Sequence, residues 1–600
     1  MANLMNSVKM SVKPSRNGFD MTFKNNFTAK AGEIRPVFCK PVLPGDVWNI
    51  NLKSFTRLQP INTAAFARMK EYYDFYFVPM EILWNKFDSV ATQMKNNLQH
   101  ASGPLLTDNV APFGGIPYIT CQQIAEYLKL VKRMNNLFGY SRAYLTCILL
   151  EYLGYGRFYQ YLEDDITWAS NPMQQNLQLS ILPLLAYQHV YADYFRYSQW
   201  ERTNPSTFNV DWIKGTDDLN VNISSVDFYS NYNFLDLRYS NFNKDLFLGV
   251  LPNAQLGDES VLDSDLSSSG NFLFSSGTVN PSGNRLTLNP LGALEMVDSS
   301  GSNSKSLTYF SGLKSSFSIL QLRMAEALQR WKEVSQSVDE DYKAQIEAQW
   351  GVKVSDYLSH QSRYLGGISS PLDINPVVNQ NLTGDSEADL HGMGTINNRG
   401  NIHFESKDEY GYIIGVYHVV PLFDYQCSGV DSMCTDTDIS DFPIPVFDRI
   451  GMQQLPSYLL SNPLKNMATS TPDYYVSEFL KVTQFLGYVP RYATWKTSVD
   501  VARGAFAGTL KNWVVPFDME LFKQVIINVL ENNQVNEGSE NSNVPDASLV
   551  TWAFFKVNPA VLDTLFSVNC DSTVDTDQFL ISSLFDTKVV RNLDVNGLPW

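Results

Sequence analysis

The chain has 600 residues, too many for one ordinary hydrophobic core, and its 44% hydrophobic content excludes wholesale disorder. Charged residues make up only 18% and aromatic residues reach 13%, the bias found at the centres of protein–protein interfaces. A net charge of −17 argues against a nucleic-acid binder with a uniformly basic surface. We therefore expect an obligate assembly, with an unusually aromatic monomer as the alternative.

Residues 1–31 form a polar, basic arm with little periodicity. Phe19, Phe23 and Phe27 alternate there with lysines, and cations interleaved with rings are how proteins bind single-stranded nucleic acid without sequence preference. Rings at this spacing equally suit an arm that is anchored on a neighbouring subunit. The residues alone do not choose between these two interpretations.

Strand patterns follow the arm. In residues 47–53 apolar and polar side chains alternate, the period of a half-buried strand, after a turn formed by Pro44, Gly45 and Asp46. Residues 72–78 (YYDFYFV) are a second β-rich run, which Pro79 ends. We predict a strand over each segment.

The middle of the chain favours helices. Apolar residues recur at helical spacing over 120–161, 184–197, 317–331 and 342–350. The aromatic stripe within 184–197 is more typical of a core than of a cofactor site. Residues 257–305 are rich in Ser, Gly, Asn and Asp, which predicts either a solvated linker or a projecting surface loop.

Strand patterns return at residues 412–420 and 551–557. Strands near both ends, with helices and loops between them, fit a β-barrel that carries large insertions. A parallel α/β sheet would need a regular alternation of strand and helix, which the sequence lacks. The fold class that we predict is mainly β with α insertions.

Motifs for chemistry are absent. The chain has no phosphate-binding GxxxxGK[ST] loop and no GxSxG nucleophile turn, and its six histidines form no zinc-binding spacing. Carboxylate clusters at 163–165, 436–441 and 571–577 could hold Ca²⁺ through their oxygens, but they fit no EF-hand loop, and solvated loop carboxylates are the favoured interpretation. We expect no metal, no cofactor and no catalysis. A catalytic triad dispersed in the sequence stays open, because triad residues need only meet in space.

The expected cellular location rests on the lack of a disulfide pattern, a signal peptide and a membrane-spanning run in the sequence. Six scattered cysteines do not suggest a disulfide scaffold, and the opening residues lack the long apolar stretch of a signal peptide. No run of 18 apolar residues is long enough to span a membrane. We expect the protein to fold in a reducing cytoplasm, with no membrane as a partner.

Several short blocks, in order along nearly the whole chain, resemble one family. They are FTAKAGE at 27–33, VLPGD at 42–46, YYDFYFVP at 72–79, DYFR at 193–196, NKDLF at 243–247, YLGG at 364–367, EYGYIIG at 409–415 and GYVPRY at 487–492. Together they resemble the major capsid protein of the Microviridae, in the gokushovirus-like group and nearest to its Alpavirinae branch in phages of Bacteroidetes.

The resemblance implies an eight-stranded antiparallel jelly roll with large inter-strand insertions. Residues 32–600 would form this single domain, with helical and loop insertions at about 120–400 and a surface protrusion at about 205–310. It also implies a T=1 icosahedral shell of about sixty copies. The implied partners are circular single-stranded DNA, an internal scaffolding protein, a pilot protein and a host surface receptor. Assembly would take place in the host bacterial cytoplasm, and the product would be the virion.

Within this picture the basic arm faces the genome. We expect five of its cations to contact phosphates without base specificity: Lys9, Lys13, Arg16, Lys24 and Lys30. The alternative function is a carbohydrate-binding or carbohydrate-acting β-protein of a phage or cell surface, suggested by the abundance of Trp and Tyr and by the long polar loops.

Overall fold

The computed structural model describes residues 16–92, 115–163, 177–213, 219–221, 223, 233–260, 285–288, 294–297, 304–306, 319–355, 360–378, 390–426, 429–460, 485–517 and 552–595. The chain divides into two compact units, one of residues 1–254 with 339–600 and one of residues 255–338.

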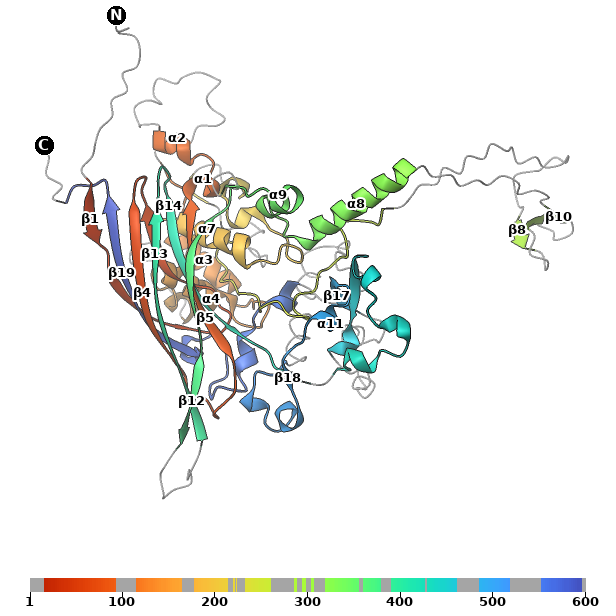
Figure 1. The fold of residues 1–600 in the computed structure, drawn as a ribbon. Helices are drawn as coiled ribbons and strands as arrows, with labels where there is room; N and C mark the ends of the chain where they lie inside the picture. The colour runs from red at the N-terminus through yellow and green to blue at the C-terminus, as the bar shows by residue number, and fades with distance from the viewer. Residues whose placement is uncertain are drawn as a thin grey trace, which may run out of the picture. The chain divides into compact units, whose positions relative to one another are not determined.

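The larger unit contains a six-stranded antiparallel sheet, in which the last strand of the chain, β19, lies between the first strands and β4 (Figure 1). The order is β1-β19-β4-β13-β12, and β2 also pairs with β19, so that β1 and β2 form one interrupted edge strand. The bounds are β1 (Asn17–Asp20), β2 (Phe23–Ala29), β4 (Val47–Leu58), β12 (Asp373–Val378), β13 (Leu390–Glu405) and β19 (Phe579–Arg591).

A second antiparallel sheet of four strands has the order β11-β5-β14-β3. Its bounds are β3 (Arg35–Val42), β5 (Met69–Pro79), β11 (Arg363–Pro371) and β14 (Gly411–Pro421). One hydrophobic core contains inward side chains of both sheets, among them Trp48 of β4, Phe585 of β19, Phe75 of β5 and Tyr417 of β14. The two sheets therefore pack face to face as a sandwich.

Hydrogen bonds inside this core also join the sheets. The Tyr73 hydroxyl lies 2.8 Å from the Ser583 hydroxyl, and the Glu71 carboxylate accepts from Thr56 at 2.6 Å and from Tyr417 at 2.9 Å. Burial raises the pKa of Glu71. Since a buried polar group without a partner is costly, these bonds favour one mutual placement of the two sheets.

Helices cover the outer face of the four-stranded sheet. A second hydrophobic cluster combines Tyr76 of β5 and Ile414 of β14 with side chains of α3, α4 and α7. The helices of this unit are α1 (Met80–Leu83), α2 (Phe87–Thr92), α3 (Cys121–Val131), α4 (Arg142–Leu153), α5 (Gln160–Glu163), α7 (Leu182–Val190) with a π-helical turn (Tyr191–Phe195), α9 (Tyr342–Trp350) and α11 (Ala493–Lys496).

Shorter strand pairs lie in the connections. They are β6 (Tyr118–Thr120) with β7 (Gln178–Ser180), β15 (Tyr425–Gln426) with β18 (Val501–Ala502), and β16 (Met452–Pro456) with β17 (Phe485–Pro490).

The smaller unit has a three-stranded antiparallel sheet and one long helix. Along this helix runs the segment 255–260, whose Leu256 amide donates to the Lys332 carbonyl at 3.3 Å. The elements are β8 (Arg285–Leu288), β9 (Leu294–Val297), β10 (Ser304–Ser306) and α8 (Ile319–Ser337).

A buried ion cluster connects the segment 30–35, in the N-terminal part of the chain, with Asp577, just before β19. The Arg35 guanidinium contacts Glu33 and lies 2.9 Å from Asp577, and the Lys30 ammonium lies 3.6 Å from Asp577. All four side chains are at most 1% exposed. Tyr152 of α4 accepts from Arg35 at 2.8 Å. The cluster balances two positive against two negative groups, which is what makes such burial tolerable.

Most predicted elements are present with shifted bounds. Strands were predicted at 47–53, 72–78 and 412–420, and β4, β5 and β14 cover all three segments. The helical segments correspond to α3, α4, α7, α8 and α9. The Ser/Gly-rich segment at 257–305 lies mostly outside the described residues.

Three sequence expectations need correction. Residues 551–557 are not a strand: Trp552–Phe555 is a 3₁₀ turn whose Phe554 and Phe555 are buried, because a short aromatic run fits any core position. The segment 17–29 is not a free arm, since β1 and β2 pair with β19. The range of about 120–400, expected to hold helical and loop insertions, also contains β11, β12 and part of β13, which belong to the sheets.

The separate unit of residues 255–338 begins and ends later than the protrusion expected at about 205–310. Its role as a protrusion stays a prediction.

Replacing Asp577 tests the ion cluster. We expect Asp577→Asn to lower the free energy of unfolding by about 3–5 kcal/mol, because it leaves Lys30 and Arg35 buried with Glu33 as their only carboxylate. Asp586→Asn in β19, where the side chain is 34% exposed, should cost less than about 1 kcal/mol. Urea unfolding of the purified chain measures both values. Equal losses would contradict a structural role for the cluster.

Candidate nucleic-acid interface

The two sheets differ in what covers their outer faces. Along β14 every residue but one is buried, because helices lie on one side and the core on the other. Along β4 and β19 buried residues alternate with half-buried or exposed ones. Among the residues that the structure describes, nothing covers the outer face of the six-stranded sheet.

Cations gather on one half of this open face. The strand register places Lys24 of β2, Lys53 of β4 and Arg399 of β13 in one transverse row, with Leu584 of β19 between the first two. Arg57 lies two rows farther along, and all four cations are exposed. We call these three rows the basic face: Lys24, Asn26, Thr28, Lys53, Phe55, Arg57, Thr395, Asn397, Arg399, Leu580, Ser582 and Leu584.

The basic face has the composition of a polyanion site. It contains no carboxylate among its twelve positions, and none of its four cations forms an ion pair within the described part of the chain. Half-buried Phe55 lies at its centre, with the Arg57 guanidinium 5.1 Å from its ring centroid. Phosphates can meet the cations while bases stack on the ring.

One cross-strand pair supports this assignment in particular. Lys53 and Arg399 are direct register partners in neighbouring antiparallel strands. Like charges in directly opposed positions destabilise a sheet, and a bound anion removes the repulsion. The pair therefore favours a site that is completed by a phosphate.

The other half of the open face is mixed in charge. Lys588 contacts Asp20 across the strands and lies 3.5 Å from Asp586. Exposed Glu405 lies at the same end. The charge is thus segregated along the strands, with Lys24, Lys53, Arg57 and Arg399 at one end and the ion-paired Lys588 toward the other.

Comparison with known proteins identifies the family. A family model described as capsid protein (F protein) matches residues 7–153 and 158–514. The chain belongs to this capsid protein family. It is 24% identical over 569 residues to capsid protein VP1 of Chlamydia phage 1, which covers 83% of this chain and 86% of that protein. It is 22% identical over 519 residues to capsid protein VP1 of Bdellovibrio phage phiMH2K, with 83% of each covered.

The resemblance to Microviridae capsid proteins is confirmed at the level of the family. The finer placement in the Alpavirinae branch stays a prediction.

The five predicted DNA-contacting cations of this capsid chain fall into different environments. Lys9 and Lys13 lie outside the described residues. Arg16 is exposed beside β1 and donates to the Gly45 carbonyl at 3.2 Å, and Lys24 is exposed on the basic face.

Lys30 is the exception and needs correction. Its ammonium donates to the carbonyls of Asp571 at 2.5 Å and Thr573 at 2.9 Å, and its side chain is 1% exposed. A phosphate cannot reach this group without opening the core, so we leave Lys30 out of the interface.

The aromatic rings of the arm also have a different role. Phe27 is buried in the main core, and Phe23 stacks on Phe585 with ring centroids 5.1 Å apart. The rings therefore fix β2 on its own sandwich. Phe55 of the basic face, and not the rings of the arm, is the side chain on which a nucleobase could stack.

Sequence reasoning missed Lys53, Arg57 and Arg399. The alternation that predicted a strand over 47–53 already placed Lys53 on the polar side, and continuing it to residue 58 would have added Arg57. Arg399 lies in a strand rich in Asn and Gly that gave no strand signal. Its position beside Lys53 follows only from the register.

No three His, Cys, Asp or Glu side chains converge on a possible metal position within the residues that the structure describes. Over the same part of the chain, no helix is both long and apolar enough to cross a bilayer.

Neutralising the basic face should weaken DNA binding and reduce its salt dependence. For Lys24→Gln, Lys53→Gln and Arg399→Gln combined, we expect the slope of log affinity against log salt to fall by about 2, since each single-strand phosphate contact contributes about 0.7. Fluorescence anisotropy of unassembled subunits with an oligothymidylate measures this slope.

A matched control removes the same charge elsewhere: Arg68→Gln, Arg157→Gln and Lys496→Gln, three exposed cations in ion pairs. The assignment fails if both triple variants change the slope equally.

Proposed function

We propose that the chain is the major capsid protein of a small single-stranded DNA phage and that its copies build a T=1 shell of about sixty subunits. The match to the capsid protein family over most of the chain carries this proposal. The aromatic-rich, charge-poor composition supports it, because much of the surface of such a subunit is buried against neighbours.

The proposed fold is a jelly roll. Taking β1 and β2 as one strand, the main strands in chain order are β1/β2, β3, β4, β5, β11, β13, β14 and β19. The sheet orders then read first-eighth-third-sixth and second-seventh-fourth-fifth, with β12 added at an edge. Two sheets that exchange strands in this way correspond to the paired Greek keys of a jelly roll. The long insertions would be residues 80–362 and 422–578.

The basic face is the proposed inner surface. Lys24, Lys53, Arg57 and Arg399 would neutralise phosphates of the genome without reading its sequence. Arg16, at the other end of the interrupted strand, and Lys9 and Lys13 of the preceding segment would add further phosphate contacts. A scaffolding protein, a pilot protein and a host receptor are the further partners that we propose, with assembly in the host cytoplasm and the virion as the final location.

We propose no catalysis. A glycosidase, the enzymatic form of the alternative function, needs two carboxylates flanking its substrate. The large pocket described below has one, Asp74. The non-catalytic part of the alternative, carbohydrate binding, is compatible with a capsid role.

Expression of the chain together with its phage's other structural proteins tests the shell. We expect sedimentation and electron microscopy to show closed particles of uniform size, with pentamer-sized intermediates and nuclease-protected single-stranded DNA. A chain that stayed monomeric under every assembly condition would contradict the proposal.

A further inference from the structure

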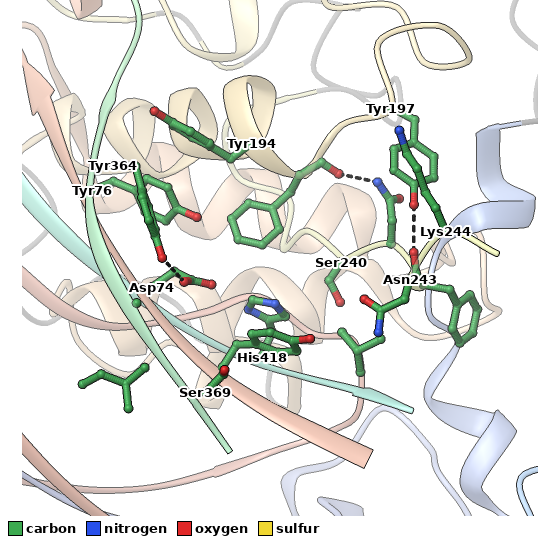
Figure 2. Close-up of a pocket in the computed structure, with 17 residues that line it drawn as sticks. Asp74, Tyr76, Tyr194, Tyr197, Ser240, Asn243, Lys244, Tyr364, Ser369 and His418 are labelled. Carbon is green, nitrogen blue, oxygen red and sulfur yellow. Dashed lines mark hydrogen bonds between the residues drawn. The ribbon is translucent and has the colours of Figure 1, made fainter. Parts of the chain in front are cut away.

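A cavity of about 610 Å³ lies over the outer face of the four-stranded sheet, beyond the part that the helices cover. Its floor comes from β5, β11 and β14. Tyr72 of β5 lines it, together with Ser369 of β11 and His418 of β14, which Figure 2 shows. Its walls come from the segments 194–197 and 240–244. The cavity is of the size of small-molecule sites and is separate from the basic face, which lies on the other sheet.

Eight of the 17 lining residues are aromatic, with His418 included. The His418 ring stacks on Tyr72, with centroids 4.9 Å apart and planes 5° from parallel, and Phe195 meets it edge-on at 5.1 Å. Tyr76 packs against Tyr364 at 5.4 Å. These contacts hold the rings in place, so a ligand meets a preformed apolar surface.

Two buried polar atoms in the lining have no hydrogen-bond partner among the residues that the structure describes. One is Nδ1 of His418, whose side chain is 6% exposed, and the other is Oδ1 of Asn241. The amide nitrogen of Asn241 donates to the Phe195 carbonyl at 2.8 Å, which fixes the orientation of that side chain. Buried polar atoms without partners are rare in folded proteins, and a ligand that brings hydrogen-bonding groups removes their cost.

A carboxylate faces the cavity from β5. One oxygen of Asp74 accepts from the Tyr364 hydroxyl at 3.1 Å. Burial raises the pKa of Asp74 to about 6, so the carboxylate is still mostly ionised at neutral pH and can accept from a ligand.

The residue opposite Asp74 in the register is Gly367. A Cβ atom there would lie 2.1 Å from the Asp74 oxygen and 2.3 Å from the Tyr364 hydroxyl. Glycine at this position is therefore what leaves room for the carboxylate–hydroxyl pair.

The charges in the cavity wall select against an ionic ligand. Asp74 lies on one side and Lys244 on the other (Figure 2). The Lys244 ammonium lies 4.8 Å from the Tyr197 ring centroid. One negative and one positive group on opposite walls favour a neutral ligand that carries several hydroxyl donors and has an apolar face.

We propose that this cavity binds a neutral sugar residue of a glycan. Sugar hydroxyls would donate to Asp74 and to Oδ1 of Asn241, a hydroxyl would pair with His418, and the apolar face of the sugar ring would lie on the aromatic lining. A nucleobase fits less well, because it offers fewer donors and brings a phosphate toward Asp74. This proposal rests on the proposed capsid function only for the source of the glycan, which would be the host surface.

Saturation-transfer NMR on assembled particles tests the site. The probes are methyl glycosides of glucose, galactose, mannose and N-acetylglucosamine, with an oligothymidylate as the nucleic-acid probe. We expect saturation transfer to at least one glycoside and none to the oligothymidylate at this site.

Variants connect the signal to the cavity. Asp74→Asn should weaken the affinity about tenfold through the loss of a charge-assisted hydrogen bond. Asp586→Asn, which changes a strand carboxylate of the other sheet, should leave it unchanged.

Each other result overturns the proposal. These are no signal from any glycoside, a signal from the oligothymidylate that Asp74→Asn abolishes, or equal losses in Asp74→Asn and Asp586→Asn. A glycoside signal that unassembled subunits give and assembled particles lack also overturns it, since a neighbouring copy would then cover the cavity. Electron microscopy of the same samples reports assembly separately. Absence of particles with a persistent glycoside signal would count against the shell and leave the pocket standing.

Discussion

The structure depends on the position of the last strand. β19 pairs with β1 and β2 on one side and with β4 on the other, and it contributes Phe579, Phe585 and Val589 to the core. The buried cluster of Lys30, Arg35 and Asp577 connects the same two ends of the chain. Burial of the core side chains and neutralisation of the buried ions therefore both require β19 to pair with the first strands. The sandwich is complete only when this last strand has joined it.

This closure leaves the two outer faces of the sandwich free to differ. The connection after β5 supplies the helices that cover the four-stranded sheet, and where this cover ends the aromatic cavity remains. The six-stranded sheet has no such cover from the described part of the chain, and its polar positions hold Lys24, Lys53 and Arg399. In a shell subunit the two faces can thus meet different partners, a glycan on one and a polyanion on the other.

The sequence predicted the elements whose local pattern agrees with their place in the fold. β4 and β5 alternate or are strongly β-rich, and α8 has helical spacing, so all three were found. β13 was missed because its run of Gly and Asn has low β propensity and is held by its neighbours. Buried and more exposed positions also alternate along β19, but no strand was predicted there. The site was only partly predictable, since whether Lys24 is exposed and Lys30 buried depends on pairing between residues more than 500 positions apart.

A reconstruction of the DNA-filled particle by electron cryomicroscopy tests the central claim most directly, because it shows which face of the sandwich meets the genome. We predict that the open six-stranded sheet lines the interior, with nucleic-acid density against Lys24, Lys53 and Arg399. The account would be contradicted by a particle in which this sheet faces the outside, or is covered by a neighbouring subunit while the density lies elsewhere.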